Sequence, residues 1–103
     1  MTSELRDLGQ LWSAVHESVE KMVEDLSDAE WLRKPRADFN NVASVLEHVT
    51  MVERRFLTVL DGKTPEPSTR NPFQADHWDV VAIRKAYADN LLYAQDVIAR
   101  LDP

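Results

Sequence analysis

The 103-residue chain contains no cysteine, which excludes disulfide bonds, thiolate zinc sites and a cysteine nucleophile. It has no apolar run near the roughly 20 residues that a membrane-spanning helix needs. The N-terminal sequence Met-Thr-Ser-Glu-Leu-Arg-Asp lacks the basic and apolar regions of a secretory signal. We therefore expect one domain, residues 1–103, located in the cytoplasm and without a membrane partner.

Basic residues are scarce relative to acidic ones. The chain has 12 Lys and Arg against 18 Asp and Glu, a formal net charge of −6. Such a chain repels a phosphate backbone on average, so we expect no nucleic-acid partner. Glycine-rich phosphate loops and dinucleotide fingerprints are also absent, because the sequence holds only two glycines. What remains is the composition of an ordinary globular domain, 44% hydrophobic and 29% charged.

Three long segments show apolar residues at spacings of three and four, which is typical of amphipathic helices. We expect these helices over residues 3–26, 41–60 and 79–101. The apolar row of the first comprises Leu5, Leu8, Leu11, Trp12, Val15, Val19, Met22, Val23 and Leu26. That of the second comprises Val42, Val45, Leu46, Val49, Val52, Phe56, Val59 and Leu60. That of the third comprises Val80, Ile83, Tyr87, Leu91, Ala94, Ile98 and Leu101.

Residues that begin and end helices lie at the borders of these segments. The sequence Ser-Asp-Ala-Glu at 27–30 fits a capping box and predicts a short helix that stops before Pro35. We expect Trp31, on this short helix, to close one end of the core. Asn41 is a good N-cap for the second long helix, and Gly62 suits the left-handed position after its end.

The sixteen residues 63–78 contain three prolines and separate the second and third long helices. A helical hairpin needs only about 2–8 residues, whereas a connection of this length can span a bundle. The sequence therefore predicts an all-α, up-down helical bundle. It has three long helices, a short helix after the first and a long crossover.

His48, in the second long helix, is the first candidate metal ligand. It flanks the apolar row, where a side chain can face a groove between helices. One turn away lie Ser44 and Val52, which are not ligands for a divalent transition metal. Further ligands would have to come from another helix or another chain. The alternative interpretation is a histidine on a helix flank with no metal.

The other two histidines are weaker candidates. His16 and Glu20 are four residues apart on the first helix, so the pair could chelate a metal, or could simply be solvated. His77 lies in the crossover beside Trp78 and could instead cap or pack. The metals that we consider for a site around these residues are zinc and nickel. Tyr87, Asn90 and Tyr93 could line a pocket on the third helix.

Two stretches carry a family resemblance: DLSDAEWLRKP at 25–35 and NVASVLEHVTMVERRFL at 41–57. In this order they are similar to the DinB-like superfamily. The resemblance implies a four-helix bundle with a long crossover between its second and third helices. It also implies that His48 is the first of three metal ligands. The other two, a His-x-x-x-His pair on the fourth helix, have no counterpart in this sequence. Characterised members include metal-dependent thiol transferases and isomerases.

Three amphipathic helices leave one side of a bundle uncovered, and a large exposed apolar groove is unusual on a monomer. A twofold dimer would cover it, so we expect a homodimer. The favoured hypothesis is a shortened scaffold of the DinB-like type that binds a small ligand or a partner and lacks the complete three-histidine site. One alternative is a metal-dependent thiol transferase or hydrolase built around His48, with His16, Glu20 or His77 contributed by either chain. Another is a helical interaction module with no small-molecule site.

Overall fold

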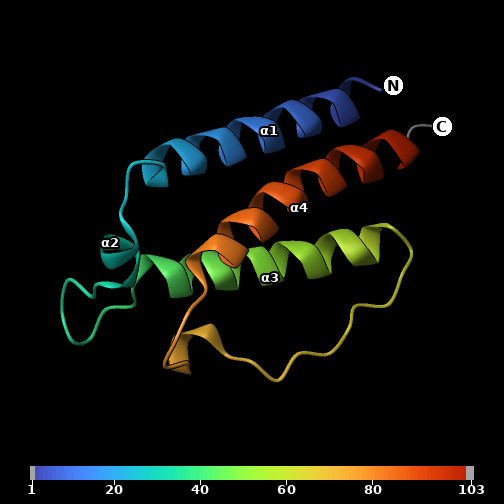
Figure 1. Cartoon of the computed structure of the whole chain (residues 1–103). Coiled ribbons are helices and arrows are strands. Elements are labelled where there is room, and N and C mark those ends of the chain that lie inside the picture. The colour runs from blue at the N-terminus through green and yellow to red at the C-terminus, as the bar shows by residue number, and fades with distance from the viewer. Residues whose placement is uncertain (1, 102–103) are drawn as a thin grey trace.

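The computed structural model describes residues 2–101, and it is helical with long connections (Figure 1). Its elements are α1 (Ser3–Val23), α2 (Asp28–Leu32), α3 (Val42–Leu60), the 3₁₀ turn η1 (Pro72–Gln74) and α4 (Val80–Leu101). Between residues 2 and 101 there is no strand. The predicted all-α bundle of three long helices and one short helix is therefore confirmed. None of the helices in this range has the length and hydropathy needed to cross a bilayer.

α4 packs against both α1 and α3. α3 and α4 run in the same direction, and α1 runs opposite to both (Figure 1). Because α3 and α4 are parallel, the chain must return along the whole bundle before α4 begins. Residues 63–78 make this return beside α3, as predicted, and η1 lies within them.

The helix ends follow the predicted capping residues. Ser27 and Glu30 form a capping box in which each side chain meets the other residue's backbone N–H. The Asn41 side chain accepts a 2.7 Å hydrogen bond from the Ser44 backbone. Gly62 has φ +75°, the left-handed conformation expected after a helix end. α1 ends at Val23, three residues before the predicted Leu26, because the chain has to turn before the Ser27 cap.

The main core lies at the α2 end of the bundle. Trp31 is 0% exposed, which confirms that it closes this end. The buried apolar residues around it are Ala43, Leu46, Val80, Ile83 and Tyr87, with Val19, Val23, Leu26, Val42 and Trp78 packed against them. At the opposite end, Asp61 accepts a hydrogen bond from the Tyr93 hydroxyl and pairs with Arg100, both at 2.7 Å. The hydrogen bond from Tyr93 lowers the pKa of Asp61.

The apolar rows of α1 and α3 are only partly in this core. On α3 the structure buries Ala43, Ser44, Leu46, Thr50 and Leu57. Most of the predicted row, namely Val45, Val49, Val52, Phe56 and Val59, is exposed instead. On α1 only His16 is fully buried. Part of each apolar row therefore packs in the core and part stays uncovered, because α4 covers one side of α1 and α3 and leaves the other side open.

Candidate functional site

The uncovered side of α1 and α3 forms one apolar surface, which we call the open face. It consists of Leu8, Leu11, Val15 and Met22 from α1 and Val45, Val49, Val52, Phe56 and Val59 from α3. Met22 is 75% exposed, Leu11 63% and Val59 60%. At roughly 100° per residue, each set falls within about a quarter of its helix circumference. Each helix therefore directs a continuous apolar row away from α4.

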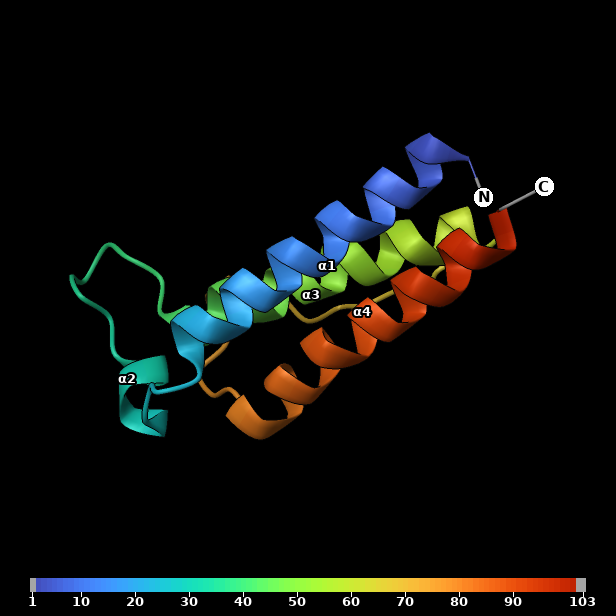
Figure 2. The same ribbon diagram turned by 90° about the horizontal axis from the view of Figure 1, so that it is seen from above.

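The two rows meet in the groove between α1 and α3. The Trp12 and Phe56 rings stack there, with centroids 6.2 Å apart and planes inclined by 24°. Seen from above, α4 lies on one side of α1 and α3 (Figure 2). On the other side, no helix among residues 2–101 covers them. The open face is thus a single surface with aromatic side chains in its floor.

A buried carboxylate lies beneath this floor. The Trp12 indole N–H donates to Glu53 Oε2 over 2.8 Å, and His16 Nε2 lies 2.7 Å from the same oxygen. Asn90 Nδ2 donates to Glu53 Oε1 over 2.9 Å and also to the Thr50 carbonyl over 3.0 Å. Donors from α1 and α4 therefore converge on one side chain of α3, whose exposure is 15%. We call Glu53, Trp12, His16 and Asn90 the carboxylate cluster.

His16 is the most buried member of this cluster, at 0% exposure. Its ring stacks on Tyr87, with centroids 4.0 Å apart and planes inclined by 13°. Its Nδ1 is buried and has no hydrogen-bond partner within residues 2–101. Burial, followed by the charges of Glu53 and Glu20, raises the pKa of Tyr87 to about 12. The Tyr87 phenol is therefore protonated at neutral pH, as a tyrosine with an ordinary pKa also is.

The structure separates the predicted metal ligands. His48 is exposed on α3, and its ring lies 4.8 Å from that of Phe73 in η1. His77 is exposed in the crossover, and its Nδ1 lies 2.9 Å from Asp76 Oδ1. Neither ring enters the bundle interior.

In the structure, the partner of His16 is on another helix and is not Glu20. His16 Nε2 contacts Glu53 on α3, and Glu20 is exposed on the surface of α1. Across residues 2–101, no group of three or more His, Asp or Glu side chains could hold a metal ion. The donor set of the chain therefore does not fit the three-ligand site that the resemblance implies, even though His48 stands at the matching position.

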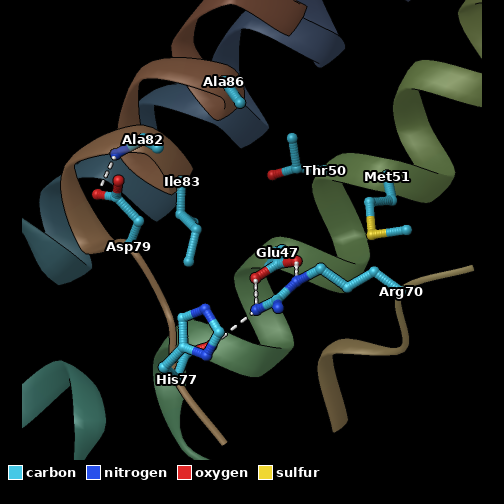
Figure 3. A pocket seen from close by; sticks show the side chains of 9 residues that line it. All are labelled: Glu47, Thr50, Met51, Arg70, His77, Asp79, Ala82, Ile83 and Ala86. Carbon is cyan, nitrogen blue, oxygen red and sulfur yellow. Dashed lines mark hydrogen bonds and ion pairs between the residues drawn. The ribbon is translucent and has the colours of Figure 1, made fainter. Parts of the chain in front are cut away.

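A pocket of about 300 Å³ opens between α3, α4 and the crossover (Figure 3). It is lined by Glu47, Thr50, Met51, Arg70, His77, Asp79, Ala82, Ile83 and Ala86. Arg70 donates to both oxygens of Glu47, from Nε over 2.6 Å and from Nη2 over 3.1 Å. Nη2 also donates to the His77 carbonyl over 2.8 Å. The hydrogen bonds with Glu47 raise the pKa of Arg70.

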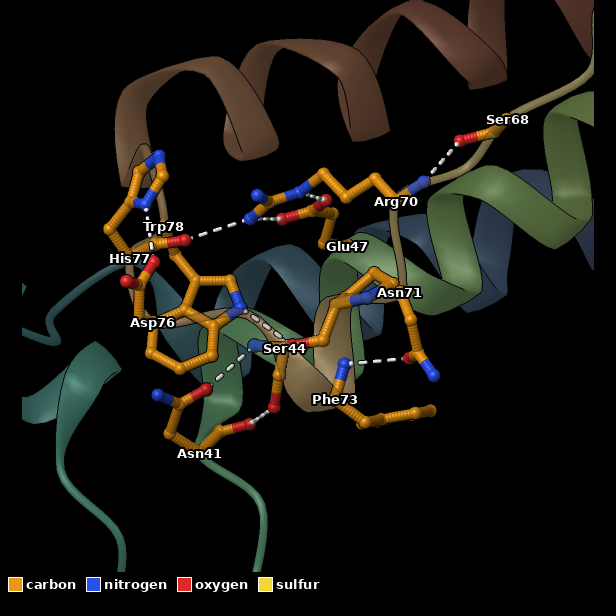
Figure 4. Close-up of polar contacts among 11 residues, drawn as sticks. Asn41, Ser44, Glu47, Ser68, Arg70, Asn71, Phe73, Asp76, His77 and Trp78 are labelled. Carbon is orange, nitrogen blue, oxygen red and sulfur yellow. Dashed lines mark hydrogen bonds and ion pairs between the residues drawn. The ribbon is translucent and has the colours of Figure 1, made fainter.

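Further hydrogen bonds fix the crossover around Arg70 (Figure 4). The Asn71 side chain accepts from the Phe73 backbone over 3.0 Å, and the Trp78 indole donates to the Pro72 carbonyl over 2.9 Å. At the start of α4, the Asp79 carboxylate accepts from the Ala82 backbone over 3.0 Å. The charged groups at the mouth of the pocket therefore already have partners within the chain.

Sequence reasoning singled out His16 and Asn90 but missed Glu53, the residue that joins them. A signal was present, because Glu53 lies seven residues after Leu46 and seven before Leu60. A carboxylate at that spacing occupies a buried row of a helix and needs donors from neighbouring helices. Glu53 was missed because the predicted apolar row of α3 consists mostly of valines, and these valines lie on the other side of the helix.

Comparison with known families agrees with this architecture. The sequence model of the DinB superfamily matches residues 11–103 of the chain. The matched region includes the carboxylate cluster, the crossover and all but the first eight residues of α1. No curated protein and no solved structure gives a significant match.

Proposed function

The chain belongs to the DinB superfamily, and from this premise we propose that it is a scaffold whose open face is covered by a second copy of itself. The observation that carries this proposal is the exposure of nine large apolar side chains on α1 and α3. Contiguous apolar patches beyond a few hundred Å² are rare on monomers and mark interaction sites. Closed twofold dimers are the commonest way in which a chain covers such a surface.

A scaffold role fits the buried chemistry better than catalysis does. Within the carboxylate cluster, both oxygens of Glu53 already accept hydrogen bonds, and His16 is closed off from solvent. Tyr87 is buried, and its ring stacks on that of His16. His48 has no second metal ligand beside it among residues 2–101. Glu53, His16 and Tyr87 hold the helices together, because their side chains contact groups of neighbouring helices.

The open face also favours a partner protein over a small ligand. The pocket beneath the crossover is at the lower end of the volume of ligand sites, about 300–1,000 Å³. Its charged residues Glu47 and Arg70 neutralise each other. The open face, in contrast, runs along most of two helices and offers no enclosed cavity. A surface of this shape fits the similar surface of another helical chain.

Thermal melting at several protein concentrations tests this proposal. Unfolding of a dimer releases two chains, so its midpoint rises with concentration by mass action. We expect the melting temperature to rise by about 3–6 °C for each tenfold increase in concentration. Circular dichroism at 222 nm, which reports helix content, follows the transition. A midpoint that is independent of concentration over about two decades would contradict the proposed dimer.

A further inference from the structure

A second pocket, of about 370 Å³, lies between the C-terminal end of α1 and the beginning of α4. Its volume falls within the range of small-molecule sites, about 300–1,000 Å³. None of its residues belongs to the open face or to the pocket beneath the crossover. The lining consists of Glu20 and Val23 of α1, Glu24 at the C-cap of α1, Leu46 of α3, and Arg84, Lys85, Tyr87 and Ala88 of α4.

The wall of this pocket contains a buried hydroxyl without a partner. Tyr87 is only 3% exposed, and it is one of the residues that the sequence singled out for a pocket. The Tyr93 hydroxyl donates to Asp61, whereas that of Tyr87 forms no hydrogen bond with any residue between 2 and 101. Buried polar groups are normally paired, because an unmet hydrogen bond costs free energy. The protonated phenol therefore offers a donor to a molecule that enters the pocket.

Opposite charges line the two long walls of the pocket. The α1 wall carries Glu20 and Glu24, and the α4 wall carries Arg84 and Lys85. Within residues 2–101 no ion pair joins the two walls, and Lys85 pairs instead with Asp89 of its own helix over 2.7 Å. Two carboxylates and two cations give the pocket no net charge. An ion of a single charge is thus attracted by one wall and repelled by the other.

We propose that this pocket binds a small zwitterion with an apolar body, such as a hydrophobic amino acid. The ammonium group of the ligand lies on the α1 wall, and its carboxylate lies on the α4 wall, where it accepts a hydrogen bond from Tyr87. The apolar body covers Val23, Leu46 and Ala88, which separate the charged groups. The proposal is independent of the dimer, because these residues lie outside the open face.

Titration of the ¹⁵N-labelled chain with L-phenylalanine, followed by NMR, tests the proposal. We expect the amide signals of residues 20–24 and 84–88 to shift saturably, with a dissociation constant of roughly 1 mM, because the ligand is small. Phenethylamine lacks the carboxylate, and 3-phenylpropionate lacks the ammonium group. Each should bind at least about threefold more weakly than L-phenylalanine, the loss expected for one partly exposed ion pair.

Variants assign each charge of the ligand to its wall. Arg84→Gln should weaken L-phenylalanine at least about threefold and should not weaken phenethylamine, which has no carboxylate. Glu20→Gln should weaken L-phenylalanine but not 3-phenylpropionate. Arg6→Gln is the matched control, because Arg6 is exposed near the other end of α1. Tyr87→Phe removes only the unpartnered hydroxyl, so it should weaken binding without lowering the melting temperature.

Several results would overturn the proposal while the proposed dimer stands. One is the absence of saturable shifts at residues 20–24 and 84–88 up to about 20 mM L-phenylalanine. Another is equal affinity for L-phenylalanine and phenethylamine, or equal binding by Arg84→Gln and Arg6→Gln. Shifts confined to the open face would also contradict it, because adsorption on exposed apolar side chains requires no pocket.

Discussion

Replacing Glu53 with alanine should destabilise the fold by about 3–5 kcal/mol, because each buried donor left without an acceptor costs roughly 1–3 kcal/mol. The substitution would leave the Trp12 indole, His16 Nε2 and one donor of Asn90 without their acceptor. These donors belong to two helices, so the loss affects the packing of α1 and α4 on α3 together. The free energy of unfolding of a domain of this size is only about 5–15 kcal/mol. Glu53→Ala would therefore remove a large share of it.

Urea unfolding followed by tryptophan fluorescence measures this loss. Glu17→Ala is the matched control, because Glu17 pairs with Lys21 over 3.4 Å on the surface and both side chains are 70% exposed. We expect this control to change stability little, as is usual for exposed pairs. Glu53→Gln should fall between the two, since its amide oxygen still accepts while its NH₂ group faces other donors. If Glu53→Ala and Glu17→Ala unfold at the same urea concentration, the carboxylate cluster does not hold the bundle together.

A glutamate at position 52 should weaken the dimer by at least about 100-fold, which corresponds to about 2.7 kcal/mol. Val52 lies on α3 within the open face, and its side chain is 52% exposed in the single copy. Val52→Glu can therefore keep the fold of one copy while it places a carboxylate in an apolar interface. Burial of an unpaired charge is costly, so the copies should separate.

The control for this substitution is Leu92→Glu. Leu92 is 65% exposed, comparable to the open-face residues, but it lies on the side of α4 away from α1 and α3. The dissociation constant of each variant is read from its mass as a function of dilution, and circular dichroism confirms that both remain helical. Equal dissociation constants for Val52→Glu, Leu92→Glu and the unsubstituted chain would show that copies do not associate through the open face.

The sequence predicted the local structure well because local interactions determine it. The Ser27 box, the Asn41 cap and the positive φ of Gly62 depend on residues within a few positions of each other. The crossover at residues 63–78 is long enough to run along the whole bundle between α3 and α4, and its length is visible in the sequence. Each of these features could be read without knowing how the helices pack.

The side of α3 that enters the core could not be predicted in this way. α3 has an apolar row of valines and a second row that includes Leu46 and Leu57; the predicted row combined the valines with Leu46 and left out Leu57. α4 packs on the second row, where Leu57 is 0% exposed. The choice depends on contacts between residues far apart in sequence, such as Asn90 with Thr50. Periodicity alone therefore identified an amphipathic helix but did not separate its covered side from its uncovered side.

The candidate site was predicted only in part, because it also depends on contacts between residues that are far apart in the sequence. His16 stood out as a histidine close to an apolar row, but its partner is on another helix at Glu53 and not one turn away at Glu20. His48 matched a family position, and the structure shows it against Phe73.

The central claim is that a second copy covers the open face of α1 and α3, and the mass of the chain in solution tests it most directly. Sedimentation equilibrium at micromolar concentration should give twice the chain mass of 11.8 kDa, with dissociation on dilution. A single species of 11.8 kDa that persists up to about 100 µM would contradict the claim, because the nine apolar side chains would then remain in water.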